Sequence, residues 1–255
     1  MHTRCMFSHA AQSELPVVLL VDDDLVSREV AATLLTMSGY SVHTAQDGAS
    51  SLEMLNSGAC RPGVILMDAQ MPGLSGNELI AELRARSKAR VYIISGSSPA
   101  ADITAASDGF LVKPFTPDAL TKLLNGQRSK ADPSLLDPSD PIVSSEVLAQ
   151  FRKMMPEPAV RQIYTAVVSD LSLRIEALGD AIAKGDAAEI RRIGHAIKGG
   201  CGMAGALQAA HLGALLEAAP SHSQDNQLDN SATLLRDLRT AAQGLERMLD
   251  SELPV

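Results

Sequence analysis

Acidic, hydroxyl and cationic side chains follow directly after four short apolar runs in the first half of the chain. Asp22 and Asp23 follow the first run, Asp68 the second, Ser95 the third and Lys113 the fourth. Clustered carboxylates repel one another unless a cation lies among them, and oxygen ligands without His or Cys suit Mg²⁺. A hydroxyl and an ammonium nearby can bind phosphoryl oxygens. Helix capping is the usual role of a single Asp at such a point, but it does not explain the whole set, which indicates phosphoryl transfer around one nucleophilic carboxylate.

The apolar runs alternate with helix-length segments, and together they predict how those side chains are positioned. Parallel strands need crossover connections, so five such units predict an α/β domain over residues 15–124 with a doubly wound, parallel five-stranded sheet. Ligands bind at the carboxyl edge of such a sheet, where the side chains above would converge. The expected strands are 16–21, 40–45, 63–67, 91–94 and 109–112, and the expected helices are 25–38, 47–56, 75–87, 100–106 and 116–124.

The composition changes at residue 125. Residues 125–140 are rich in Pro, Ser and Asp and lack periodicity, which is typical of a linker. Residues 141–255 carry only helical patterns and predict a helical-bundle domain, whereas residues 1–14 lack the apolar stretch of a secretory signal and are expected to be a disordered leader. The expected helices are 144–155, 158–184, 186–204, 206–219 and 227–253.

The expected helix over 186–204 holds a second candidate site. His195 lies about 160° around the helix from its buried apolar stripe, which predicts a solvent-facing ring with Lys198 on the same side. An isolated exposed His is usually plain surface. Each helical glycine costs roughly 1 kcal/mol relative to Ala, so a cluster of them favours close approach of another protein surface instead. The cluster consists of Gly199, Gly200 and Gly202.

Five segments of the first half resemble the receiver domain of two-component response regulators. They are Val17–Asp23 (VVLLVDD) with Arg28, Ile65–Asp68 (ILMD), Met71–Gly73 (MPG), Ser95, and Lys113–Phe115 (KPF). The resemblance implies a flavodoxin-like fold of strand order 2-1-3-4-5. The stretch between Ser95 and Lys113 is shorter than in most receivers and leaves a short fourth helix.

The same resemblance implies roles for the site residues. Asp68 would accept the phosphoryl group, and Mg²⁺ would bind to Asp23, Asp68 and the main-chain carbonyl of Gln70, with Asp22 acting through metal-bound water. Ser95 and Lys113 would bind the phosphoryl oxygens. Two further residues complete the resemblance: Phe110, as the aromatic residue that reorients on activation, and Pro114, as the site of a candidate cis bond after Lys113.

The second half resembles the histidine-containing phosphotransfer (Hpt) domain over residues 141–255. The resemblance rests on His195–Gly199 (HAIKG) together with Leu215–Glu217 (LLE). It implies that His195 accepts a phosphoryl group on a ring nitrogen and that Lys198 assists. Neutral imidazole is the nucleophile, and an ordinary His pKa near 6.5 leaves a neutral fraction at cellular pH.

Composition and charge exclude other classes of function. The chain of 255 residues carries 22 Lys and Arg against 30 Asp and Glu, a formal net charge of -8, which argues against nucleic-acid binding and against an anionic membrane surface. The longest apolar run, 17–21, is too short for membrane insertion. The odd number of widely spaced cysteines fits a reducing compartment, so we expect a cytoplasmic protein. The cysteines are Cys5, Cys60 and Cys201.

The two halves together predict a phosphorelay protein that accepts a phosphoryl group on Asp68 and carries or exchanges one on His195. We expect a sensor histidine kinase and the receiver domain of another response regulator as partners. No ATP-binding kinase pattern is visible, so we expect a phosphoryl carrier with self-catalysed Asp phosphorylation and dephosphorylation, not a kinase. Two alternatives stay open, a receiver-gated interaction module and a phosphate sink without net relay. A phosphatase of the haloacid-dehalogenase type is weaker, because Gln70 stands where its second Asp would be.

Overall fold

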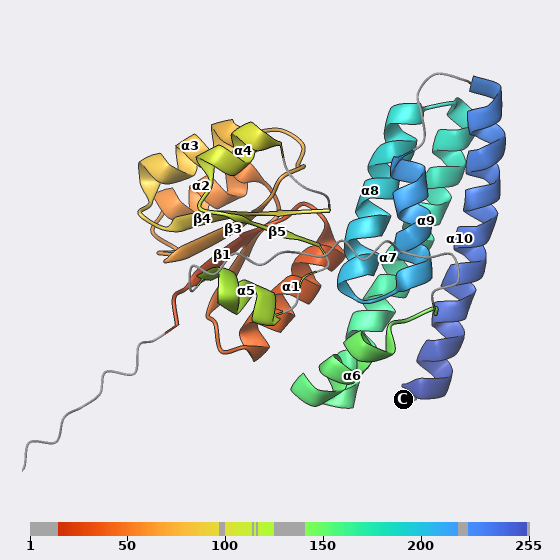
Figure 1. Cartoon of the computed structure of the whole chain (residues 1–255), viewed down its shortest axis with the longest axis horizontal. Helices are drawn as coiled ribbons and strands as arrows, with labels where there is room; N and C mark the ends of the chain where they lie inside the picture. The colour runs from red at the N-terminus through yellow and green to blue at the C-terminus, as the bar shows by residue number, and fades with distance from the viewer. Residues whose placement is uncertain are drawn as a thin grey trace, which may run out of the picture.

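The computed structural model describes residues 15–96, 100–113, 115, 117–124, 141–218 and 224–253 (Figure 1). These residues form an α/β domain followed by a domain of long helices. The expected leader 1–14, the expected linker 125–140 and Pro114 lie outside the described residues. Across the described residues no helix is long and apolar enough to cross a membrane.

The α/β domain is built on a five-stranded parallel sheet of order β2-β1-β3-β4-β5, which confirms the predicted doubly wound fold. The central strands read as continuous apolar runs because helices cover both faces of the sheet. Val21 pairs with Met67 across β1 and β3, so the residues that follow in each strand emerge next to each other. The strands are β1 (Val18–Val21), β2 (Val42–Ala45), β3 (Val64–Asp68), β4 (Arg90–Ser95) and β5 (Phe110–Val112).

Two layers of helices enclose the sheet (Figure 1). Helices α1 and α5 cover one face, on which Leu20 and Leu66 are fully buried, and α2, α3 and α4 cover the other, on which Leu19 and Ile65 are fully buried. Helix α4 is short, as expected from the sequence. The helices are α1 (Leu25–Met37), α2 (Gly48–Asn56), α3 (Gly76–Arg86), α4 (Ala101–Ala106) and α5 (Pro117–Leu124).

The second domain contains helices only, among the residues that the structure describes there. Its core includes Tyr164, which is fully buried and donates a hydrogen bond to the carbonyl of Ala204 at 2.9 Å. Gly185 ends α7 in the left-handed conformation (φ 65°), which a residue with a Cβ adopts only with strain. The helices are α6 (Ser145–Met154), α7 (Glu157–Lys184), α8 (Ala187–Met203), α9 (Leu207–Glu217) and α10 (Gln224–Glu252).

The two domains share one apolar core. A single cluster of buried side chains runs from the α1 face of the sheet into the helical domain, and it includes Val26 of α1 together with Ile197 and Cys201 of α8. Helix α1 lies beside α7 and α8 (Figure 1). Continuous burial of apolar surface between domains stabilises one relative orientation of the two.

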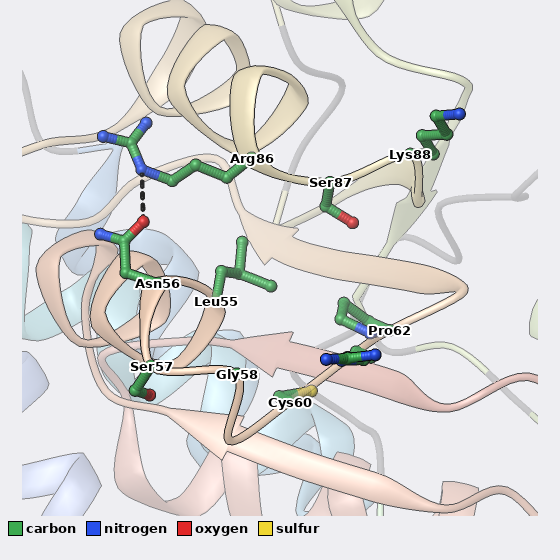
Figure 2. Close-up of a pocket in the computed structure, with 10 residues that line it drawn as sticks. Leu55, Asn56, Ser57, Gly58, Cys60, Pro62, Arg86, Ser87 and Lys88 are labelled. Carbon is green, nitrogen blue, oxygen red and sulfur yellow. Dashed lines mark hydrogen bonds between the residues drawn. The ribbon is translucent and has the colours of Figure 1, made fainter.

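A cavity of about 510 Å³ lies away from the carboxyl edge of the sheet, near the beginnings of β3 and β4 (Figure 2). Its lining includes Cys60, Arg86 and Lys88 but no carboxylate among the described residues. Arg86 is already bonded to Asn56 at 3.1 Å, and burial raises the pKa of the Cys60 thiol. This cavity therefore offers no activated nucleophile.

Candidate functional site

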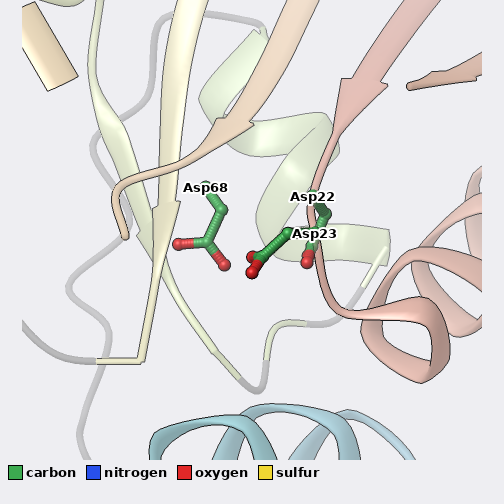
Figure 3. A group of neighbouring side chains, drawn as sticks. All are labelled: Asp22, Asp23 and Asp68. Carbon is green, nitrogen blue, oxygen red and sulfur yellow. The ribbon is translucent and has the colours of Figure 1, made fainter. Parts of the chain in front are cut away.

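Three carboxylates meet at the carboxyl edge of the sheet (Figure 3). One oxygen each from Asp22, Asp23 and Asp68 lies within 4.8 Å of the others. The pairing of β1 with β3 brings Asp22 next to Asp68, and both are almost fully buried, whereas Asp23 reaches solvent and is only partly buried. The structure thus gathers the acidic residues that the sequence analysis singled out.

Lys113 bridges the two buried carboxylates. Its Nζ lies 2.7 Å from Oδ2 of Asp22 and 2.6 Å from Oδ2 of Asp68. Burial alone lowers the pKa of Lys113, but the two carboxylates outweigh it and raise the pKa above its ordinary value. The ammonium therefore stays charged beside Asp68 at cellular pH.

The charge of the cluster fits a divalent cation. Three carboxylates and one ammonium leave two uncompensated negative charges, and burial together with repulsion from Asp68 and Asp22 raises the pKa of Asp23. Oxygen donors of this kind suit Mg²⁺. Asp22 accepts hydrogen bonds at both of its oxygens, from the backbone N–H of Asp24 at 2.9 Å and from the Ser27 hydroxyl at 2.8 Å, and this fits contact with a cation through water.

The remaining predicted residues of the receiver half are Gln70, Ser95 and Phe110. The backbone N–H of Gln70 donates to Oδ1 of Asp68 at 2.9 Å, and Gln70 lines the cavity above the carboxylates. Ser95 ends β4 and is buried, and Phe110 begins β5 and is half-buried. The Lys113 ammonium and the Gln70 backbone N–H therefore both reach the Asp68 carboxylate, and Ser95 ends the strand next to it.

His195 lies on α8 and forms a hydrogen bond with α9. Its Nδ1 is 2.8 Å from Oε1 of Glu217, and Nζ of Lys198 is 3.0 Å from Oε2 of the same carboxylate. The hydrogen bond from His195, followed by that from Lys198, lowers the pKa of Glu217 to about 2. An ionised carboxylate only accepts hydrogen bonds, so Nδ1 of His195 is the donor in this pair and Nε2 takes no part in it.

The expectation of a solvent-facing His195 is wrong in degree. Only 19% of its side chain is exposed. Glu217 covers one side of the ring, and a methyl group added at Gly96 of the α/β domain would lie 3.4 Å from His195 Cε1. Helical periodicity correctly excludes His195 from the apolar stripe of α8, but it cannot predict that another domain covers the ring.

Sequence reasoning missed the glycines that place Glu217. A Cβ at Gly194 of α8 would lie 2.7 Å from Cβ of Leu216, and a Cβ at Gly213 of α9 would lie 2.6 Å from the backbone nitrogen of Lys198. Real Cβ atoms do not approach other atoms this closely, so α8 and α9 pack at this distance only because both positions are glycine. The signal was present as two glycines inside helical patterns, which often mark close packing.

The two candidate sites open into one cavity of about 490 Å³. Asp23, Asp68 and Lys113 line it from the sheet edge, and His195 and Glu217 line it from the helical domain.

Models of known protein families match both domains of the chain. The response regulator receiver domain matches residues 18–125, and the Hpt domain matches residues 162–250. The chain contains a receiver domain and an Hpt domain. This combination fits a phosphorelay protein and two-component signalling.

Curated relatives resemble somewhat more than half of the chain. Response regulator MprA of Mycobacterium bovis (strain BCG / Pasteur 1173P2) is 33% identical over 152 residues, which is 57% of this chain and 62% of the relative, and MprA of Mycobacterium ulcerans is 32% identical over 151 residues, with the same two shares. The chain thus spans less than two thirds of the length of these relatives.

Solved structures of response regulators are similar to part of the chain. The response regulator TrrA of Thermotoga maritima, solved in complex with Mg²⁺-BeF, is 29% identical and covers 44% of this chain and 98% of its own, with a TM-score of 0.40. The chemotaxis protein CheY4 of Vibrio cholerae is 29% identical and covers 45% of this chain and 99% of its own, with a TM-score of 0.39.

Proposed function

We propose that this protein is a phosphoryl carrier of a phosphorelay, with Asp68 of the receiver domain and His195 of the Hpt domain as its two phosphoacceptors. The observation that carries the proposal is the position of the Lys113 ammonium, 2.6 Å from the buried Asp68 carboxylate, in a cavity that also receives His195. A permanent positive charge beside a nucleophilic carboxylate supplies the neutralisation that phosphoryl transfer requires.

At the receiver site an oxygen of Asp68 attacks the phosphorus of the donor. A new O–P bond forms, the bond to the donor breaks, and the donor leaves with the bonding electrons. Lys113 and Ser95 hold the phosphoryl oxygens, and the backbone N–H of Gln70 positions the Asp68 carboxylate. Mg²⁺, held by Asp23, Asp68 and the Gln70 carbonyl, with Asp22 contributing through water, would neutralise negative charge on the transferred group.

At the Hpt site Nε2 of His195 is the nucleophile. Glu217 fixes the ring orientation through Nδ1 and balances the positive charge that the ring gains when Nε2 forms a bond to phosphorus. Lys198 is held by the same Glu217 carboxylate, and its ammonium attracts the anionic phosphoryl group.

The proposed partners are a sensor histidine kinase, which would supply phosphoryl groups, and the receiver domain of another response regulator, which would exchange them with His195. We also propose that the protein has no ATP-dependent kinase activity of its own. The cytoplasm is the proposed compartment, in keeping with the free, buried thiols of Cys60 and Cys201. In the alternative function, a partner phosphorylates His195, the phosphoryl group passes to Asp68, and hydrolysis there makes the receiver a phosphate sink. That function uses the same residues.

The test is phosphorylation of the purified chain by acetyl phosphate with Mg²⁺, read by intact-mass and peptide mass spectrometry. We expect a base-labile acyl phosphate that is absent from Asp68→Asn and an acid-labile phosphohistidine that is absent from His195→Gln. Failure of both residues to accept phosphate, from acetyl phosphate and from purified histidine kinases alike, would reject the proposal. Phosphate at Asp68 that only hydrolyses would favour the phosphate sink.

A further inference from the structure

The receiver domain docks on its own Hpt domain through α1. Val26 of α1 is 3% exposed and belongs to the apolar cluster that includes Ile197 and Cys201 of α8. Helix α1 also lies against α7. The contact therefore buries apolar surface from both domains and favours one orientation.

Gly200 sets how closely the domains approach. A Cβ at this position would lie 3.1 Å from Oδ1 of Asp24 and 3.4 Å from Cβ of Val26, both in the receiver domain. The neighbouring Gly199 has nothing within 4 Å of its Cβ position. A glycine inside a helix is unfavourable by roughly 1 kcal/mol, and at position 200 the close approach of α1 explains it. The surface that the glycine cluster was expected to admit is, in this structure, the receiver domain of the same chain.

The ion pair between Asp24 of the receiver and Arg174 of the helical domain links the two domains at a second place. Oδ1 of Asp24 caps α1 by accepting from the backbone N–H of Ser27 at 2.7 Å, and its Oδ2 pairs with Arg174 of α7. Asp170 pairs with the same guanidinium, so Arg174 is held from both sides. Burial lowers the pKa of Arg174, but Asp24 and Asp170 raise it above its ordinary value. A largely buried pair with several partners holds a fixed geometry better than an exposed one.

This docking points the two phosphoacceptors at one space. The Cβ position of Gly96, next to Ser95 in the receiver, lies 3.4 Å from Cε1 of His195 and 3.7 Å from Nζ of Lys198. Both domains contribute cations to the lining of the shared cavity, and an equal number of carboxylates lies among them. The cations are Lys113, Arg174, Arg191 and Arg192, and the carboxylates are those of Asp23, Asp24, Asp68 and Glu217. In Figure 3 the blue-green helix of the Hpt domain passes beside the carboxylate cluster.

We infer that Asp68 and His195 of one chain exchange a phosphoryl group directly, in the docked arrangement that Gly200 and the Asp24–Arg174 pair hold. The inference rests on the proposed function. Nε2 of His195 attacks the phosphorus of the Asp68 acyl phosphate, the N–P bond forms, the O–P bond breaks, and Asp68 leaves as a carboxylate paired with Lys113. The proton on Nδ1 stays in its hydrogen bond to Glu217. The reverse step regenerates the acyl phosphate.

The first test separates transfer within a chain from transfer between chains. The full chain is phosphorylated with acetyl phosphate and Mg²⁺ over a wide range of protein concentration, and phosphohistidine is followed in time. We expect its rate per molecule to be independent of concentration. A mixture of Asp68→Asn and His195→Gln chains, which can react only by encounter, should form phosphohistidine at least about tenfold more slowly at low concentration. A wild-type rate that rises with concentration and matches the mixture would overturn the inference.

The second test opens the docked interface without altering either phosphoacceptor. Gly200→Ala should reduce phosphohistidine formation several-fold, because the added methyl group, 3.1 Å from Oδ1 of Asp24, requires α1 to shift by a few tenths of an ångström and misaligns the reacting atoms. Acyl phosphate at Asp68 should form as in wild type. Gly179→Ala is the matched control, a helical glycine of α7 whose added Cβ would meet only Leu235 at 3.9 Å, and it should transfer normally.

A third variant weakens the same interface without adding a side chain inside a helix, so its result does not depend on how Gly200→Ala folds. Asp24→Ser keeps a helix-capping side chain but removes the receiver-domain partner of Arg174, and it should also slow transfer while leaving Asp68 phosphorylation intact. Unaltered transfer in both Gly200→Ala and Asp24→Ser would overturn the inference. Phosphorylation of Asp68 with no phosphohistidine from the same chain would reject the inference alone, whereas absence of acyl phosphate from every variant that contains Asp68 would reject the proposed function as well.

Discussion

Nδ1 of His195 and Oε1 of Glu217 lie 2.8 Å apart, so the ring is oriented by a carboxylate from the neighbouring helix. Glu217 also holds Lys198, and it thereby acts as a positioning residue for both of the side chains that would meet the phosphoryl group. Its own position depends on the close packing of α8 against α9 at Gly194 and Gly213.

The Glu217→Gln substitution should slow phosphorylation of His195 about tenfold, because a neutral amide holds the Nδ1 proton less firmly. Nitrogen-15 NMR of the ring should show wild-type His195 mainly in the Nδ1–H form and the variant with a larger share of Nε2–H. Glu176→Gln, an exposed position of α7, is the control and should change neither. An unaltered tautomer ratio in Glu217→Gln would rule out the positioning role.

The hydrogen bonds of Glu217 should also make stability depend on pH. Its pKa is lowered from 4.5 to about 2 in the folded state, so its ionised form contributes stability that is complete above about pH 5 and is lost as the pH falls toward 2. Urea unfolding of wild type and Glu217→Gln should therefore differ by on the order of 2 kcal/mol near neutral pH. That difference should shrink steadily below pH 4.5; a constant difference would contradict the assigned bonds.

The Lys113→Gln substitution should destabilise the receiver domain by about 3 kcal/mol in the presence of EDTA, since it leaves two buried carboxylates without their cation. Mg²⁺ should restore part of the loss by binding to the folded state, and acetyl phosphate should no longer label Asp68 efficiently. Lys88→Gln, an exposed position near the opposite edge of the sheet, should unfold like wild type. The comparison is made by urea titration with and without Mg²⁺.

The Asp23→Asn substitution should distinguish two effects of the Asp23 charge, its repulsion by the neighbouring carboxylates and its contribution to Mg²⁺ binding. Burial and the neighbouring carboxylates disfavour the charge on Asp23, so its removal should stabilise the metal-free protein slightly at neutral pH. The same change removes a proposed ligand and should weaken the stabilisation that added Mg²⁺ produces. Thermal unfolding against Mg²⁺ concentration measures both effects, and stronger stabilisation by Mg²⁺ in the variant would argue against Asp23 as a ligand.

The Gly194→Ala substitution should separate α8 from α9. Its methyl group would lie 2.7 Å from Cβ of Leu216, and overpacking of this kind costs about 1–3 kcal/mol. Gly199→Ala, five residues along the same helix, meets nothing within 4 Å and should leave the domain equally stable or more so, by up to about 1 kcal/mol. Unfolding free energies of the two variants provide the comparison; equal stability would mean that α8 and α9 can shift at little cost.

The sequence determined the local half of this molecule. Apolar runs of strand length, each ended by a polar residue, placed Asp22, Asp68, Ser95 and Lys113 at the carboxyl edge, because parallel pairing brings equivalent strand ends together. Helical periodicity placed Lys198 on the side of His195 and excluded both from the apolar stripe. The helical inferences depend on contacts between residues that are close in sequence. The inferences about the sheet depend on its topology, and short connections between strands allow only a few topologies.

The tertiary structure decided which surfaces face each other. Periodicity shows that one side of α8 is buried, but it does not show that α9 brings Glu217 to His195, or that α1 of the receiver lies against Gly200. Asp24 and Arg174 are 150 residues apart in sequence, and neither carries a local signal of its partner. Pairings of this kind arise from the shape and charge of whole domain surfaces, because close packing and ion-pair geometry are satisfied only when both surfaces are present.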